Sequence, residues 1–183
     1  MRLGRVEATG GFFLLLAWLN YMDRSFLVPM ALAACAAHEL GHIAVIRLLG
    51  GTIKEIHLTA IGAELVLARP LAYWQEGLSA LAGPGINLLL ALIGCRFTLT
   101  FAGVNLALAL FNLLPVGRLD GGRAVYCTLA LLAGPDPADR VGRWLDCLFT
   151  AGVAAAGLFL ALHGGNITLL PAAFWLLAVF VHK

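Results

Sequence analysis

Residues 27–49, LVPMALAACAAHELGHIAVIRLL, form an apolar run with two histidines and a glutamate near its middle. The run is long enough to cross a bilayer, because a helix needs about 20 apolar residues to span a core of about 30 Å. Ionisable side chains at that depth cost roughly 2.5–3.5 kcal/mol each on insertion scales. A helix with three of them in mid-span therefore needs a compensating partner, and a divalent metal ion would be one.

The polar residues of this run form the motif His38-Glu39-Leu40-Gly41-His42, an H-E-x-x-H sequence. Residues at i and i+4 share one face of a helix, so both imidazoles can reach one zinc ion. Glu39 projects beside them and can take a proton from a water molecule. The motif predicts that His38 and His42 bind Zn²⁺ and that Glu39 is the catalytic base.

A catalytic zinc ion usually has three protein ligands, so two histidines leave one position to fill. The candidates for it are Glu55, His57, Glu64 and Asp120. Asp120 is preferred and Glu64 comes next, because residues 112–122, NLLPVGRLDGG, place Asp120 between a helix-breaking proline and two glycines. Such a backbone can turn a carboxylate inward. Unwound backbone at membrane depth is tolerated only where protein or a water-filled cavity lines it.

The composition predicts a membrane protein. The chain has 183 residues, of which 61% are hydrophobic and 12% are charged, and its mean hydropathy is +0.92. A soluble domain averages about 45–50% apolar and about 25% charged residues. This chain therefore has too few polar residues to cover a water-facing surface, which excludes a soluble zinc protease. The net charge of +2 and the lack of a basic run give no indication of a nucleic-acid partner.

The fold class predicted from these patterns is an all-α polytopic membrane protein, formed as one domain over residues 1–183. About six transmembrane helices are expected, with five or seven left open, and residues 51–69 predict a small β-hairpin between the second and third. The break at 134–137 separates two of the spans. The pieces at 97–114 and 118–133 count as one broken element or as two. The predicted spans are 9–22, 27–49, 73–94, 97–114, 118–133, 143–162 and 166–182.

The distribution of basic residues predicts which side of the cell membrane each loop faces. With six spans, ten of the 12 lysines and arginines fall on or near the side of the two termini. Only Arg24 and Arg96 fall on the other side. Because cytoplasmic loops carry the excess of Lys and Arg, both termini are predicted to be cytosolic.

Two motifs together resemble those of a known family. HELGH on an early span, followed downstream by N-x-x-P-x-x-x-x-D-G, is similar to the site-2 protease family of intramembrane zinc proteases. Residues 82–87, AGPGIN, resemble a Gly-Pro stretch on the middle helix of that family. The order of these segments is most similar to the bacterial branch that contains the sporulation sigma-factor-processing protease. The resemblance covers residues 25–135, and no CBS or PDZ domain is recognised in the chain.

The resemblance implies a zinc metalloendopeptidase in which His38, His42 and Asp120 hold the metal and Glu39 is the base. Its substrate would be a membrane-embedded or membrane-associated protein, and cleavage would in some cases release a transcription factor. A homo-oligomer or an inhibitory membrane partner is left open.

Two amides inside apolar helices, Asn87 and Asn112, are candidates for binding the substrate backbone or an oxyanion. The alternative for both is that they only join helices. The alternative for the whole chain is a non-enzymatic metal-binding membrane protein or metal transporter. A transporter would need a polar pathway across the bilayer, whereas the polar residues of this sequence cluster near one depth.

Overall fold

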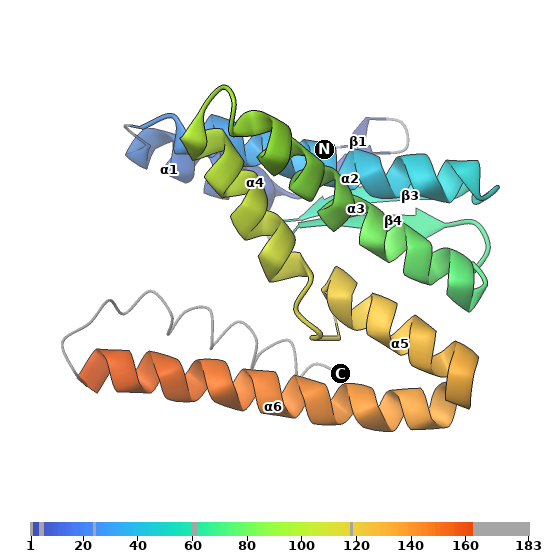
Figure 1. Ribbon diagram of the computed structural model, residues 1–183. Coiled ribbons are helices and arrows are strands. Elements are labelled where there is room, and N and C mark those ends of the chain that lie inside the picture. The colour runs from blue at the N-terminus through green and yellow to red at the C-terminus, as the bar shows by residue number, and fades with distance from the viewer. Residues whose placement is uncertain (1, 4–5, 24, 60–61, 118, 163–183) are drawn as a thin grey trace.

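The computed structural model describes residues 2–3, 6–23, 25–59, 62–117 and 119–162 (Figure 1). Helices α1 to α4 and the sheet lie together on one side of the molecule, and α5 and α6 lie on the other (Figure 1). The predicted span at 166–182 lies outside the described residues. The elements in chain order are β1 (Arg2–Leu3), β2 (Val6–Ala8), α1 (Gly10–Met22), α2 (Leu27–Leu48), β3 (Ile53–Thr59), β4 (Gly62–Leu67), α3 (Tyr73–Gly94), α4 (Leu99–Asn112), α5 (Asp120–Ala133) and α6 (Pro135–Leu162).

The predicted hairpin is confirmed, and the sheet is larger than predicted. Strands β3 and β4 pair antiparallel, with His57 opposite Glu64. Strand β2 joins β3 in parallel, and β1 pairs with β2, so the order is β1-β2-β3-β4. Pairing with β2 covers one edge of the hairpin, where free backbone groups would otherwise invite another chain. The other edge of the hairpin is formed by β4, which pairs with no further strand among the described residues.

The turn between α1 and α2 is held by the side chain of Asp23. Its two carboxylate oxygens accept the backbone N–H groups of Ser25 and Val28, each at 2.9 Å. The bond from Val28 and then that from Ser25 lower the pKa of Asp23, because both bonds favour the charged carboxylate. Pro29 follows in the first turn of α2, where its missing N–H has no helical partner to lose.

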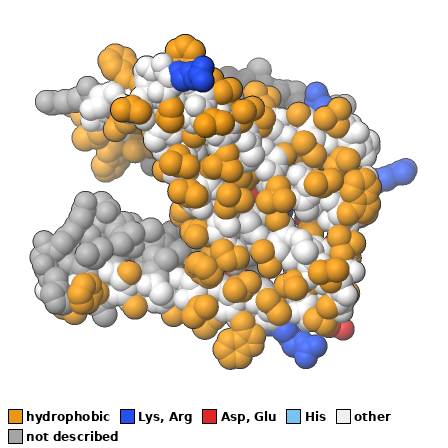
Figure 2. Space-filling view, in the orientation of Figure 1, with side chains coloured by type: hydrophobic (Ala, Val, Ile, Leu, Met, Phe, Trp, Pro, Cys, Tyr) orange, Lys and Arg blue, Asp and Glu red, His pale blue; other side chains and the backbone are white. Residues whose placement is uncertain are grey.

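The interior of the described part of the protein is made mostly of small and polar residues, and most large apolar residues lie outside. The largest fully buried side chains include Asn87, Asn105 and Ser79. Large apolar side chains such as Leu92 and Phe97 are 74% and 80% exposed. Figure 2 shows the result on one face, with hydrophobic side chains over most of it and basic ones near the margins. This distribution suits a protein whose outer surface meets lipid, since small residues let membrane helices pack closely.

The expected number of about six spans is not confirmed. Within the described ranges, α2 and α3 are the helices long and apolar enough to cross a membrane, and α4 is a shorter apolar helix. Helix α1 has 13 residues and α4 has 14. At 1.5 Å per residue, each reaches only about 20 Å of a core that is about 30 Å thick. The described residues thus contain two helices of spanning length.

The connection from α4 to α5 shows why the two glycines after Asp120 are needed. Both are helical residues in the first turn of α5, and neither has a positive φ. A Cβ on Gly121 would collide with the carbonyl oxygen of Leu113, and one on Gly122 with that of Val116. The glycines therefore act through their missing Cβ and not through a positive φ, and the Asp120 carboxylate faces His38. Their role is to let the incoming loop lie directly against the helix.

Helix α6 begins at Pro135, eight residues before the predicted start at 143. The chain breaks at Gly134, whose φ is +92°, a conformation that favours glycine. Pro135 and Pro137 then fall in the first turn, where proline is compatible with a helix. The break at 134–137 was thus predicted at the right place, and its extent was overestimated.

We expect Gly121→Ala and Gly122→Ala each to destabilise the protein by about 1–3 kcal/mol, the usual range for overpacking. Each Cβ would meet a backbone carbonyl that cannot rotate away. Gly103→Ala is the matched control, because a Cβ at this α4 position meets nothing within 4 Å. It should be neutral or stabilising by up to about 1 kcal/mol. Thermal unfolding in detergent would measure these effects, and equal stability of all three variants would contradict the packing account.

Candidate metal centre

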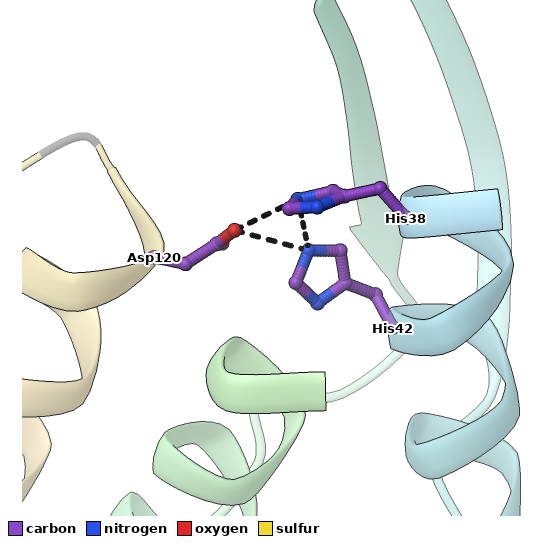
Figure 3. A group of neighbouring side chains, drawn as sticks. All are labelled: His38, His42 and Asp120. Carbon is purple, nitrogen blue, oxygen red and sulfur yellow. Dashed lines mark hydrogen bonds and ion pairs between the residues drawn. The ribbon is translucent and has the colours of Figure 1, made fainter. Parts of the chain in front are cut away.

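Three buried side chains from two elements meet at one point (Figure 3). His38 and His42 project from α2, and Asp120 is the first residue of α5. The Nε2 atoms of the two rings are 3.1 Å apart, and Asp120 Oδ2 lies 2.9 Å from His38 Nε2 and 3.3 Å from His42 Nε2. Ligands at about 2.0–2.2 Å around a tetrahedral zinc ion are separated by roughly 3.3–3.6 Å. The three atoms are thus spaced nearly as ligands of one ion would be.

The hydrogen bonds on the far side of each ring decide which nitrogen carries the proton. His42 Nδ1 lies 2.6 Å from the backbone oxygen of Ser79, which can only accept. His38 Nδ1 lies 2.6 Å from Asn87 Oδ1. The amide of Asn87 is oriented by its Nδ2, which donates to the backbone oxygen of Ala34, so Oδ1 is the acceptor. Both rings therefore hold their proton on Nδ1 and present the Nε2 lone pair to the centre.

This proton placement leaves three electron-rich atoms facing one another. Two Nε2 lone pairs and a carboxylate oxygen of Asp120 converge with no donor of their own if the rings are neutral. Acceptors held at about 3 Å repel unless a proton or a cation lies between them. Two imidazole nitrogens and one carboxylate oxygen are a donor set that zinc uses at catalytic sites. The residues therefore fit a divalent zinc ion.

Helix α3 supplies the surface against which the histidines rest. Ser79, Gly83 and Asn87 are spaced four residues apart, so they lie along one face of α3. The helices cross so that His42 meets Ser79 and His38 meets Asn87. Between them, a Cβ on Gly83 would come within 2.7 Å of His38 Nε2 and would collide with His42 Nε2. The absent side chain of Gly83 is what leaves room for the centre.

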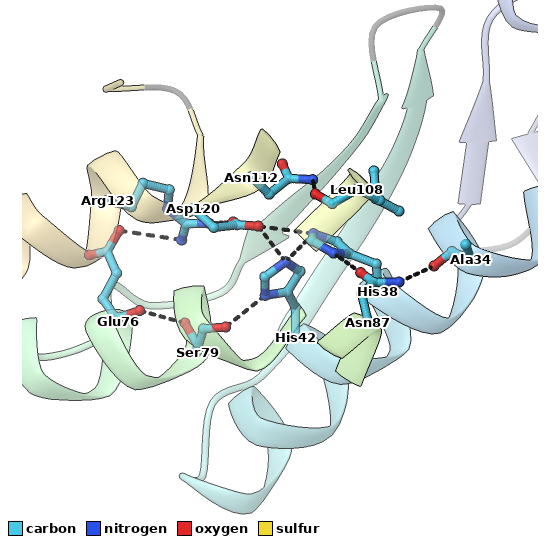
Figure 4. Close-up of polar contacts among 10 residues, drawn as sticks. All are labelled: Ala34, His38, His42, Glu76, Ser79, Asn87, Leu108, Asn112, Asp120 and Arg123. Carbon is cyan, nitrogen blue, oxygen red and sulfur yellow. Dashed lines mark hydrogen bonds and ion pairs between the residues drawn. The ribbon is translucent and has the colours of Figure 1, made fainter. Parts of the chain in front are cut away.

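The second oxygen of Asp120 faces a charged pair at the side of the site (Figure 4). Arg123 approaches Asp120 Oδ1 at 3.7 Å and Glu76 at 3.5 Å. Arg123 is one helical turn after Asp120, and Glu76 stands in the first turn of α3. The guanidinium thus attracts one oxygen of the carboxylate while the other faces the histidines. The Arg123 side chain is 40% exposed, so its surroundings partly screen the attraction between Arg123 and Asp120.

Glu39 lies beside the three converging residues and is outside their group. It follows His38 on α2 and is half-buried. The set of side chains close enough to share a metal ion within the described part of the chain is His38, His42 and Asp120. This placement leaves the Glu39 carboxylate available to a water molecule and agrees with a base rather than a ligand.

The other predicted residues occupy different surroundings. Asn112 Nδ2 donates to the backbone oxygen of Leu108 at 3.0 Å, within its own helix. Asn87 is fully buried, and its amide holds His38. His57 and Glu55 pair with each other at 3.3 Å on the hairpin.

Two groups that orient the site were missed in the sequence. The Ser79 carbonyl is a backbone group that any residue would supply, so no side-chain motif marks it. Asn105 has the same signal as Asn87 and Asn112, an amide inside an apolar helix, but only the packing of α3 on α4 reveals its contact with Asn87. Arg123 was recognisable only as a charge three residues after Asp120.

Comparisons with known proteins agree with the geometry of the site. No family model matches the chain. It is 32% identical over 167 residues to "Putative zinc metalloprotease sll0528" of Synechocystis sp., covering 80% of this chain and 42% of the relative. It is 33% identical over 171 residues to "Putative zinc metalloprotease Rip3" of Mycobacterium tuberculosis, covering 74% of this chain and 42% of the relative. The chain thus spans less than half the length of these curated relatives.

The arrangement of helices and strands is also found in a solved structure. "Site-2 Protease from Methanocaldococcus jannaschii" matches with a TM-score of 0.70 over 96% of this chain and 89% of that chain, at 23% identity. The chain has the site-2 protease fold. The resemblance drawn from HELGH and NLLPVGRLDGG is confirmed by this fold and by the names of the relatives. The finer likeness to the sporulation branch stays a prediction.

We expect the Gly83→Ala variant to bind less zinc than the wild-type protein. The added methyl group would occupy the space beside the Nε2 atoms of His38 and His42. Gly85→Ala is the control, since a Cβ two residues later on the same helix meets nothing within 4 Å. The zinc-to-protein ratio of the purified variants, read by atomic absorption, would measure the effect. Full zinc occupancy in a folded Gly83→Ala protein would contradict this account of the space.

Proposed function

We propose that this chain is a zinc metalloendopeptidase that cleaves a peptide bond of a membrane-embedded or membrane-associated protein. The observation that carries the proposal is the convergence of two imidazole lone pairs and a carboxylate oxygen, with a free glutamate beside them. The relatives named as zinc metalloproteases support it. We propose His38, His42 and Asp120 as the zinc ligands and Glu39 as the base.

Bound to these ligands, zinc would polarise the scissile carbonyl and make an adjacent water more acidic. The protein's own residues do the rest. Glu39 accepts a proton from the water while the oxygen of that water attacks the carbonyl carbon. Glu39 then returns that proton to the leaving nitrogen as the carbon–nitrogen bond breaks. Ser79 and Asn87 keep the two rings in the tautomer that this chemistry needs.

The substrate segment must be extended when it is cut, since a helical amide hides its carbonyl in an internal hydrogen bond. We propose that the free edge of β4 holds this segment by strand addition. The half-buried Asn112 stays a candidate for contact with the substrate backbone. We also propose that cleavage releases a transcription factor in some cases. Regulation by a second membrane protein or by a second copy of this chain is part of the same proposal.

A metal transporter is the competing function. It would require polar side chains at successive depths along a pathway through the protein. Six of the eight buried polar residues in the described part of the chain instead form one connected group around the centre. They are His38, His42, Ser79, Asn87, Asn105 and Asp120. The other two, Asp146 and Thr150, belong to α6. The gathering of most buried polar side chains around one centre favours catalysis over transport.

We expect Glu39→Gln to abolish cleavage of a co-expressed substrate and to retain zinc, because Glu39 is outside the ligand group. Asp120→Ala should lower both zinc content and activity. Glu64→Ala should spare the metal, and it is the control for the third ligand. Cleavage on immunoblots and zinc by atomic absorption would measure the three variants. Loss of zinc from folded Glu39→Gln, or full zinc in Asp120→Ala, would refute the assigned roles.

We also propose that the termini are cytosolic, which places the α3–α4 turn on the opposite side of the membrane. Cys95 ends α3 in this turn and is exposed, so it is a natural probe. In a variant with Cys95 as its single cysteine, an impermeant thiol reagent should label intact cells. Lys54→Cys on the exposed face of β3, without Cys95, should be labelled only after permeabilisation. The reverse pattern would overturn the orientation.

A further inference from the structure

A line of hydrogen bonds runs from the backbone of α4 to the His38 ring across two buried amides. Asn105 Nδ2 donates to the backbone oxygen of Phe101 at 2.9 Å. Asn87 Nδ2 donates to Asn105 Oδ1 at 2.8 Å, and His38 Nδ1 meets Asn87 Oδ1 at 2.6 Å. Both asparagines are 0% exposed, and among the described residues they are the two largest fully buried side chains.

Every bond in this line has a fixed direction. The Phe101 oxygen can only accept, so the NH₂ group of Asn105 faces it and the amide oxygen of Asn105 faces Asn87. That oxygen, together with the Ala34 oxygen, fixes the NH₂ group of Asn87. The remaining oxygen of Asn87 must then accept from His38. Two backbone carbonyls, that of Phe101 on α4 and that of Ala34 on α2, therefore determine the tautomer of the His38 ring.

We propose that Asn105 is a positioning residue for the metal centre, acting on His38 through Asn87. The hydrogen bonds of the Asn105 amide go to Asn87 and to the Phe101 backbone, and none goes to His42, Asp120 or Glu39. The Asn105 oxygen holds the Asn87 amide in the one orientation that presents an acceptor to His38 Nδ1. Groups bonded directly to a metal-ligating histidine typically change metal affinity by about 10–100-fold when they are removed. Asn105 acts one hydrogen bond further away, so its effect is expected at the low end of that range.

The same geometry gives Asn87 a role different from substrate binding. Its Oδ1 is bonded to His38, and its two N–H groups are bonded to Ala34 and Asn105. A fully buried amide with these partners has no donor left for a substrate. Asn87 and Asn105 thus form one relay between α4 and the histidine, and Asn112 is the amide left for substrate contact.

The inference rests on the proposed zinc site, and zinc affinity measured by chelator competition tests it. Asn105→Leu keeps the approximate volume and removes both hydrogen bonds, so it should weaken zinc binding about tenfold. Asn105→Asp should bind zinc nearly as wild type does. A buried carboxyl group stays neutral, so its O–H can face Phe101 while its carbonyl accepts from Asn87.

Thr128→Val is the control for loss of a side-chain hydrogen bond away from the site. The Thr128 hydroxyl donates to the backbone oxygen of Ala124 at 2.8 Å, four residues earlier on α5, as Asn105 donates to Phe101 on α4. The zinc affinity of Thr128→Val should match that of the wild type. Thermal unfolding of the metal-free variants would separate loss of stability from loss of affinity. If Asn105→Leu does not fold, Asn105→Ala takes its place.

The outcomes separate the two proposals. A wild-type protein that binds no zinc would refute the metal centre itself. A wild type that binds zinc, with Asn105→Leu equal to Thr128→Val in zinc affinity, would refute the relay alone. Equal weakening in Asn105→Leu and Asn105→Asp would also refute it, because the aspartic acid keeps the two hydrogen bonds that leucine lacks. Effects of Asn87→Leu and Asn105→Leu that do not add in the double variant would support one connected relay.

Discussion

Each imidazole at the centre of this protein has two nitrogens, and each nitrogen needs a partner in an interior that excludes water. Helix α3 meets that requirement on one side by presenting the Ser79 carbonyl to His42 and the Asn87 amide to His38. The other nitrogen of each ring is left for the centre. The i, i+4 spacing on α2 and the spacing of Ser79, Gly83 and Asn87 on α3 place these partners opposite one another. The close, glycine-lined packing of the two helices follows from this requirement.

The same requirement explains why the interior is polar while the surface is apolar. In a soluble protein the large apolar side chains form the core, because water drives them together. Here lipid is as apolar as leucine, so burying leucine brings little gain, and packing and hydrogen bonds hold the helices instead. Small residues such as Ala34 and Ala80 are fully buried, and amides such as Asn105 join helices through their hydrogen bonds. The sequence pattern of a membrane core is thus small and polar, with bulky residues outside.

The sequence predicted those features that depend on local spacing. HELGH places two rings on one face whatever surrounds the helix, and Asp120 was marked by the proline and glycines around it. The hairpin at 51–69 was also recognised, from punctuating glycines. Features that depend on tertiary contact were missed, such as the pairing of β2 with β3 and of Asn87 with Asn105. The expected six spans are not confirmed, because α1 and α4 are too short to cross alone and the predicted span at 166–182 lies outside the described residues.

The histidines and the carboxylate are positioned by different means. Both rings are oriented by hydrogen bonds between packed helices, whereas Asp120 depends on how the loop from Leu113 to Leu119 lies against α5. Gly117 of that loop donates to buried Asp146 on α6, and Val116 and Leu119 pack with Phe149 of the same helix. Helix α6 therefore supports the carboxylate indirectly, through the loop. Because no hydrogen bond of the rings reaches α6, a change in the packing of α6 would move the carboxylate relative to rings that stay fixed.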